Sequence, residues 1–167
     1  VFLKNFGEKE KFFLLGAGSN ILIDDQKTFD GVFIKLGKEF SNISTLRDNI
    51  LVAGSATLDR KLSLFAMENS LTGFEFLSCI PGTIGGGLKM NSGCFSSEFK
   101  DIVVSIQALS KDGKIITLPK SELNFGYRQN NMDKDLIFLS ASFLGKKGDR
   151  SAIEKKTNML IKKKNEV

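Results

Sequence analysis

Residues 78–93 of the chain read SCIPGTIGGGLKMNSG. Five glycines, one proline and one asparagine stand in this run, so we expect the backbone to bend tightly and to leave amides uncovered. Backbone N–H groups that converge from a loop or a helix start form a binding surface for an anion. The run therefore predicts a phosphate-binding loop, and a buried glycine-rich turn is the plainer alternative.

A second glycine-rich run lies near the start of the chain, where residues 14–23 read LLGAGSNILI. Two glycine-rich loops in one small domain predict a long ligand with several negative charges. The run is not a dinucleotide-binding Rossmann turn, because that motif needs a third glycine where Ile21 stands. It also needs a helix, and the acidic pair Asp24 and Asp25 interrupts one.

Four motifs, in this order, resemble the UDP-N-acetylenolpyruvoylglucosamine reductase family, also called the UDP-N-acetylmuramate dehydrogenases. They are GAGSNIL at 16–22, IPGTIGG at 80–86, NSG at 91–93 and FGYR at 125–128. The resemblance implies an α+β fold, the FAD-binding fold of the vanillyl-alcohol-oxidase/PCMH type, in which FAD lies between two α+β subdomains.

The same resemblance divides the chain. It assigns residues 1–37 to part of a first FAD-binding subdomain and residues 38–167 to the second. It also implies that the extreme N-terminus and a C-terminal substrate domain are missing, together with the serine and glutamate that protonate the substrate. We therefore expect this chain alone to bind FAD weakly or not at all and not to reduce substrate.

Cofactor binding is assigned by the resemblance to both glycine-rich loops. Their backbone and side-chain groups are expected to bind the diphosphate of non-covalent FAD through charge-assisted hydrogen bonds. The expected cofactor-binding residues are Gly16, Ala17, Gly18, Ser19, Asn20, Ile21, Leu22, Pro81, Gly82, Thr83, Gly85, Gly86, Asn91 and Gly93.

Tyr127 and Arg128 are the residues that the resemblance assigns to the substrate. Arg128 is expected to be catalytic as well, because a permanent positive charge stabilises an enolate-like intermediate at the enolpyruvyl carboxylate. Without the family, the same residues are a half-buried tyrosine and a surface arginine. Asn130 departs from the family, which often carries serine there.

The activity that the resemblance implies is reduction of UDP-N-acetylglucosamine-enolpyruvate to UDP-N-acetylmuramate, with NADPH as co-substrate, in peptidoglycan precursor synthesis. The expected enzyme is a cytoplasmic monomer whose partner is a small-molecule UDP-sugar, with no nucleic acid and no membrane. Two alternatives remain open: the FAD-binding domain of another oxidoreductase of the same fold, and a non-catalytic nucleotide-binding module.

Composition narrows the chemistry further. The 167 residues include no histidine, which excludes a Ser-His-Asp triad, a histidine-based zinc site and a histidyl-flavin link, and we expect no metal. The net charge of +5 comes largely from lysines near the C-terminus, which fit a solvated helix face better than a nucleic-acid surface. No apolar run is long enough to span a membrane. Cys79 and Cys94 are expected as free thiols, although a disulfide across the loop is conceivable.

Local patterns predict the elements around the motifs. Thr57 is expected to cap a helix over 58–69, and Ser151 with Glu154 forms a capping box for a final amphipathic helix. A short helix is expected near 86–91. Strands are expected at 12–15, 21–23, 32–36, 50–53 and 136–144, with a hairpin over 102–118 that turns at Asp112-Gly113.

Overall fold

The computed structural model describes residues 11–26, 28–127, 129–130 and 132–166. Its strands are β1 (Phe12–Leu14), β2 (Val32–Ile34), β3 (Ile43–Arg47), β4 (Ile50–Gly54), β5 (Leu71–Thr72), β6 (Gly93–Cys94), β7 (Ser97–Glu98), β8 (Val103–Leu109), β9 (Ile115–Pro119), β10 (Phe125–Gly126), β11 (Gln129–Asn130), β12 (Ile137–Leu144) and β13 (Lys146–Lys147). Its helices are α2 (Asp59–Glu68), α3 (Ile84–Met90), α4 (Phe99–Ile102) and α5 (Arg150–Asn165), with 3-10 turns η1 (Lys38–Phe40), η2 (Glu75–Cys79) and η3 (Lys120–Glu122).

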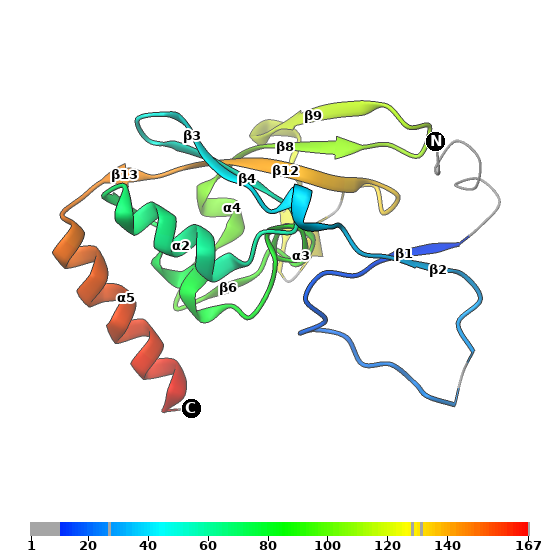
Figure 1. Cartoon of the computed structure of the whole chain (residues 1–167), viewed down its shortest axis with the longest axis horizontal. Helices are drawn as coiled ribbons and strands as arrows, with labels where there is room; N and C mark the ends of the chain where they lie inside the picture. The colour runs from blue at the N-terminus through cyan, green and yellow to red at the C-terminus, as the bar shows by residue number, and fades with distance from the viewer. Residues whose placement is uncertain (1–10, 27, 128, 131, 167) are drawn as a thin grey trace.

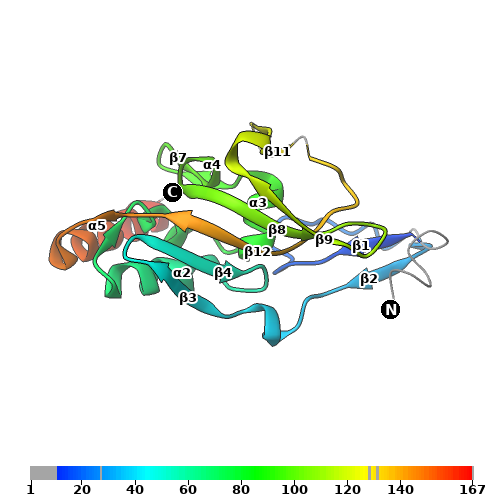
Figure 2. The same cartoon turned by 90° about the horizontal axis from the view of Figure 1, so that it is seen from above.

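The centre of the molecule is a five-stranded antiparallel sheet with the strand order β3-β4-β12-β8-β9. Helices α2, α3 and α4 lie against one face of this sheet, while α5 extends away from it (Figure 1). The view from above shows the strands spread over the helices (Figure 2). Antiparallel strands with helices segregated to one face make the architecture α+β.

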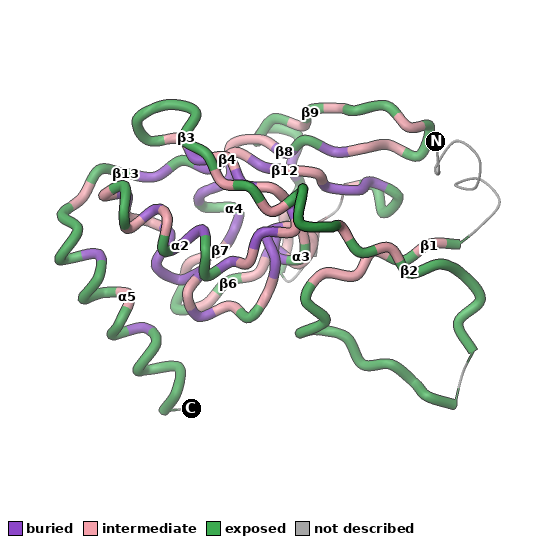
Figure 3. The backbone as a smooth tube through the Cα atoms, viewed as in Figure 1, coloured by how far each residue is buried: buried purple, intermediate pink, exposed green. Residues whose placement is uncertain are grey.

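The core lies between this sheet and the helices beneath it, where the buried segments gather (Figure 3). Alternation along β4 sends Leu51 and Ala53 to the buried face, where both have no exposed surface. Phe99 of α4 lies at the middle of this layer and makes edge-on contacts with Phe76 and Phe143, at centroid distances of 6.2 and 6.0 Å. Burial of such aromatic side chains is a large part of the stabilisation of a domain core.

Strands β1 and β2 form a separate parallel pair beside the main sheet. Leu15 N–H donates to Ile34 O at 2.8 Å and continues the ladder. The expected strand at 21–23 is wrong: these residues are irregular and exposed, and Leu22 is 99% exposed. A strand needs a hydrogen-bonded neighbour, and none of the described residues pairs with this segment.

Two expected helix caps are also wrong. Leu58 is the N-cap of α2, and Thr57 is buried, with its carbonyl accepting from Ile84 N–H at 2.9 Å. Helix α5 begins two residues earlier than a cap at Ser151 requires, because the Asp149 side chain accepts from Ala152 N–H at 2.8 Å. In α5 another residue, Asp149, caps the first turn. In α2 the tertiary structure satisfies the first turn's backbone groups without a side-chain cap.

The other strong local signals are confirmed. Strands β8 and β9 pair antiparallel on either side of the turn at Gly113, which has φ +80°. Helix α3 follows the central glycine run, and Asn91 ends it in the left-handed conformation. Strand β3, for which no strand was expected, pairs with β4 and has exposed side chains along most of its length.

Helix α5 is attached to the rest of the fold through Glu75 of η2. The Glu75 carboxylate accepts from Thr72 Oγ1 at 2.5 Å and from Gly73 N–H at 2.8 Å, and Lys156 Nζ lies 3.3 Å from it. Burial opposes ionisation of Glu75, but these hydrogen bonds and the lysine charge outweigh it and hold its pKa below the usual value. The carboxylate therefore stays charged at neutral pH and joins α5 to η2.

Candidate functional site

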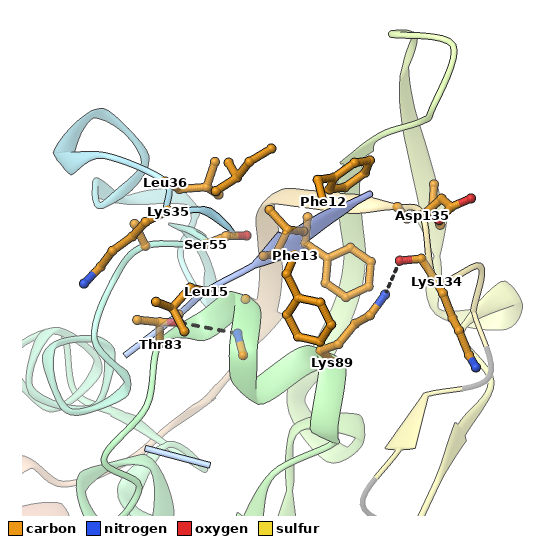
Figure 4. A pocket seen from close by; sticks show the side chains of 18 of the residues that line it. Phe12, Phe13, Leu15, Lys35, Leu36, Ser55, Thr83, Lys89, Lys134 and Asp135 are labelled. Atoms are coloured by element: carbon orange, nitrogen blue, oxygen red, sulfur yellow. Dashed lines mark hydrogen bonds between the residues drawn. The ribbon is translucent and has the colours of Figure 1, made fainter. Parts of the chain in front are cut away.

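A cavity of about 590 Å³ lies between the β1–β2 pair and the start of helix α3 (Figure 4). Ligand pockets in proteins typically have this size and a mainly apolar lining with a few polar groups. The lining residues are Phe12, Phe13, Leu14, Leu15, Gly16, Ile34, Lys35, Leu36, Ser55, Ala56, Thr83, Gly85, Gly86, Lys89, Asn130, Met132, Lys134, Asp135, Leu136 and Phe138.

The two glycine-rich loops meet at one point of this cavity. A methyl group placed on Gly16 would lie only 2.8 Å from Thr83 Oγ1, so glycine permits the close approach of β1 to the start of α3. Both residues line the cavity, together with Gly85 and Gly86. Of the GAGSNIL motif at 16–22, Gly16 alone is in the lining; the other six residues are exposed outside it, namely Ala17, Gly18, Ser19, Asn20, Ile21 and Leu22.

Most backbone amides at the start of α3 are already hydrogen-bonded within the protein. Ile84 N–H donates to Thr57 O and Gly85 N–H donates to Ser55 O, both at 2.9 Å. Gly86 N–H points at Thr83 Oγ1, which accepts at 3.4 Å and caps the helix. The expectation of uncovered amides is therefore wrong at Gly85, whose role here is to let α3 approach the segment after β4.

Four more of the expected cofactor-binding residues lie outside the cavity lining. Pro81 and Gly82 precede the helix, and a methyl group on Gly82 would lie 2.6 Å from the Asp59 carboxylate. Asn91 and Gly93 follow it.

The side chain of Asn91 is fully used in the structure. Its amide nitrogen donates to Glu98 Oε2 at 2.7 Å and to Gly126 O at 3.1 Å, while its oxygen accepts from Lys100 N–H at 3.0 Å. These bonds join the end of α3 to α4 and to the β10–β11 hairpin.

Three lysines line the cavity, namely Lys35, Lys89 and Lys134, together with one carboxylate, Asp135. None of these lysines was among the expected site residues. The Nζ of Lys89 in α3 donates to the carbonyls of Asp133 and Lys134 at 3.4 and 3.3 Å and lies over the Phe138 ring. Figure 4 shows its bond to Lys134. Burial lowers the pKa of Lys89, and the charges of Asp133 and Asp135 oppose that shift. The position of Lys89 within the SCIPGTIGGGLKMNSG run was the available signal for it.

The β10–β11 hairpin brings Asn130, but not Tyr127, into the cavity lining. Asn130 lines the cavity and donates from its side chain to Leu88 O at 2.9 Å. Tyr127, at the turn, is 85% exposed. Arg128 lies outside the described residues.

Neither of the two cysteines lines the cavity. Both are free thiols. Burial and the neighbouring Cys79 thiol raise the pKa of Cys94 to about 11, so Cys94 is not a ready nucleophile. Across the described ranges, no three acidic or cysteine side chains gather as metal ligands, and no helix has the length and apolarity to cross a bilayer.

Residues 6–119 match the FAD binding domain family. That match covers more than half of the chain and includes both loops that meet at the cavity. The chain belongs to this FAD-binding family. The α+β FAD-binding fold expected from the sequence is thereby confirmed.

Two curated relatives that bear the same name match most of the chain. The chain is 62% identical over 164 residues to UDP-N-acetylenolpyruvoylglucosamine reductase of Pelagibacter ubique (strain HTCC1062), a match that covers 98% of this chain and 54% of the relative. The protein of the same name from Rickettsia canadensis (strain McKiel) is 49% identical, with 91% of this chain and 51% of the relative covered. The chain thus spans about half the length of the curated relatives it matches.

Solved structures extend the comparison. The crystal structure of UDP-N-acetylenolpyruvylglucosamine reductase from Thermus caldophilus superposes with a TM-score of 0.82 at 27% identity, covering 98% of this chain and 59% of that one. A carbon monoxide dehydrogenase from Hydrogenophaga pseudoflava superposes with a TM-score of 0.64 at 14% identity, covering 86% of this chain and 55% of that one. The second likeness shows a shared fold.

Proposed function

We propose that this chain is the FAD-binding part of a flavin-dependent reductase. The reaction is the NADPH-dependent reduction of UDP-N-acetylglucosamine-enolpyruvate to UDP-N-acetylmuramate, a step of peptidoglycan precursor synthesis. The observation that carries the proposal is the 62% identity, over 98% of the chain, with a reductase of that substrate. The enzyme is cytoplasmic and monomeric in this proposal, as the family resemblance implies.

The cavity fits the group that the family binds. Its apolar wall, which includes Phe12, Phe13 and Phe138, suits the aromatic rings of FAD. Gly16 has no side chain and lies close to Thr83, so a ligand in the cavity can approach its backbone. The three lysines that line the cavity attract the negative charges of phosphate groups. We assign the diphosphate of FAD to the place where Gly16 meets Gly85 and Gly86. We assign the boundary between the two FAD-binding subdomains, at residue 37, to the chain between the β1–β2 pair and the main sheet.

Bound FAD supplies the hydride-transfer chemistry. The protein binds and orients the cofactor and the substrate. The apolar wall excludes water, and the lining lysines attract the charged groups of the ligands. Tyr127, exposed at the hairpin turn, is available to contact the substrate. Arg128 is assigned to stabilise negative charge on the enolpyruvyl carboxylate. Attachment is non-covalent, since the chain has no histidine and neither cysteine lines the cavity.

The proposal is tested with a chimera in which the 164 matched residues replace the corresponding half of the Pelagibacter relative. We expect the chimera to oxidise NADPH when the enolpyruvyl sugar nucleotide is present and to remain idle with UDP-N-acetylglucosamine. The 167-residue chain alone is expected to show no turnover. A folded, FAD-loaded chimera that ignores the enolpyruvyl substrate contradicts the proposed reaction.

A further inference from the structure

Three polar side chains after strand β4 are buried without a hydrogen-bond partner among the described residues. They are Ser55, Thr57 and Asp59, which are 4%, 0% and 0% exposed. Buried polar groups are normally paired, so each calls for a physical reason. Ser55 differs from the other two because it lines the cavity.

The position of Ser55 is fixed from both sides. Its N–H donates to Leu139 O of the central strand, and its carbonyl accepts from Gly85 N–H, both at 2.9 Å. A methyl group on Gly85 would lie 3.0 Å from Ser55 Cβ and 3.4 Å from its Oγ, so the side chain rests directly against the glycine. Figure 4 shows the Ser55 side chain at the cavity wall, among the lining residues of both sheets.

Neighbouring groups on this wall leave the Ser55 hydroxyl without a partner. The Gly85 N–H already donates to the Ser55 carbonyl, and the Gly86 N–H donates to Thr83 Oγ1. A hydroxyl has one hydrogen to donate and rotates to suit its acceptor. An acceptor of a ligand in the cavity would satisfy Ser55 once a small shift of the wall exposes its hydroxyl oxygen, which is itself buried.

We propose that Ser55 is a cofactor-binding residue whose hydroxyl donates a hydrogen bond to a diphosphate oxygen of the bound dinucleotide. The inference rests on the proposed placement of the diphosphate beside Gly85–Gly86. Ser55 lies 33 residues after the GAGSNIL motif and 25 residues before the IPGTIGG motif, and it belongs to neither. It therefore adds a third segment of the chain to the phosphate site.

The test compares Ser55→Ala with wild type in the chimera described above, at constant salt, with FAD and riboflavin titrations followed by quenching of flavin fluorescence and ADP binding followed by displacement of FAD. Loss of one charge-assisted hydrogen bond is expected to weaken FAD binding by about 10- to 100-fold. ADP, which keeps the diphosphate, is expected to lose affinity by a similar factor, whereas riboflavin, which lacks it, is expected to bind equally to both proteins. Far-UV circular dichroism and the melting temperature without ligand check that Ser55→Ala is folded, and Ser55→Gly serves as a second deletion of the hydroxyl.

Thr57→Val is the matched control. It removes another buried, unpartnered hydroxyl from the same segment, but Thr57 does not line the cavity, so FAD affinity is expected to stay within twofold of wild type. Equal FAD affinity in Ser55→Ala and wild type overturns the assignment of Ser55, and a loss for riboflavin as large as for FAD overturns the diphosphate as its partner. A folded chimera with Ser55 intact that binds no FAD even at saturating concentrations overturns the proposed cofactor site itself, and with it the role of Ser55.

Discussion

Adjacent glycines in α3 separate a requirement of the fold from a requirement of the site. Gly87 is buried beneath Phe99, whose ring a methyl group would overlap, whereas a methyl group on Gly86 would make an ordinary 3.5 Å contact with Thr83 Oγ1. We expect Gly87→Ala to lower the free energy of unfolding by about 1–3 kcal/mol through overpacking. Gly86→Ala is expected to change it by less than about 0.5 kcal/mol.

We expect Gly86→Ala to weaken FAD binding more than Gly87→Ala does, because Gly86 lines the cavity and a methyl group there occupies space for the ligand. Urea unfolding and FAD titration of both variants measure the two effects. Equal loss of stability in both variants would contradict the distinction drawn between the two positions.

Asp59 gives the fold a pH dependence of its own. Burial without a charged partner among the described residues raises the pKa of Asp59 from 3.8 to about 8. Between these pH values the folded state holds a proton that the unfolded state has released. Stability from this group is therefore fully present below about pH 4 and falls as the pH rises towards 8, by about 1.4 kcal/mol per pH unit.

The substitution that tests this is Asp59→Asn, which cannot titrate. Urea unfolding of both proteins without FAD, at a series of pH values from 5 to about 9, is expected to show a steeper decline for wild type up to about pH 8 and parallel curves above it. Parallel curves over the whole series would mean that Asp59 is ionised in the folded protein.

Single residues of the site were the hardest to obtain from sequence. The glycine motifs pointed to Gly16, Thr83, Gly85 and Gly86, all of which line the cavity. Ser55 carries no motif: it reaches the cavity because β4 lies beside β12 in the sheet, a relation between distant segments that local patterns do not encode. Conversely, the exposed residues from Ala17 to Leu22 carry the motif but lie outside the lining.

At the scale of elements, the end of α3 is held by Asn91, which combines a left-handed backbone (φ 42°, ψ 48°) with three side-chain hydrogen bonds. Two substitutions separate these roles. Asn91→Gly keeps the backbone conformation and loses the bonds, which we expect to cost about 2–4 kcal/mol. Asn91→Ala loses both and is expected to cost about 1 kcal/mol more.

Chemical unfolding of the two variants checks the ordering. If alanine is tolerated as well as glycine, the left-handed conformation contributes nothing and the side-chain bonds carry the whole effect. If neither variant is destabilised, the junction of α3 with α4 and the hairpin is not held by this residue.

Elements with a strong local signal could be predicted, and those defined by neighbours could not. The β8–β9 hairpin has a turn signal at Asp112-Gly113, and β12 has a long apolar run. Strand β3 reads ISTLR, is exposed along most of its length and exists because β4 offers an edge. The apolar run at 21–23 has strand propensity but no partner in the described structure, so it stays irregular.

At the scale of the whole molecule, the cavity lies between two sheets that no strand pairing among the described residues connects. One wall comes from β1 and β2 and the other from α3 and β12. A ligand that contacts both walls stabilises their association by mass action, by about 2.7 kcal/mol at a free concentration of 100 times the dissociation constant.

We therefore expect saturating FAD to slow hydrogen exchange at the amides of Leu15 and Val32, whose hydrogen bonds hold the β1–β2 pair. Amides of β8 and β12 in the main sheet serve as the internal control and should change little below the global limit. Protection that is confined to the main sheet would place the ligand away from β1 and β2.

The strand order has a consequence for synthesis on the ribosome. Strand β12 is central in space but late in sequence, so a nascent chain makes the β3–β4 and β8–β9 hairpins before the strand that joins them exists. Until residue 144 has left the exit tunnel, the inner edges of β4 and β8 each present unpaired backbone groups. Premature termination just upstream of β12 thus yields a polypeptide with two unpaired strand edges, which chaperones and proteases recognise. Binding of FAD cannot replace the missing strand.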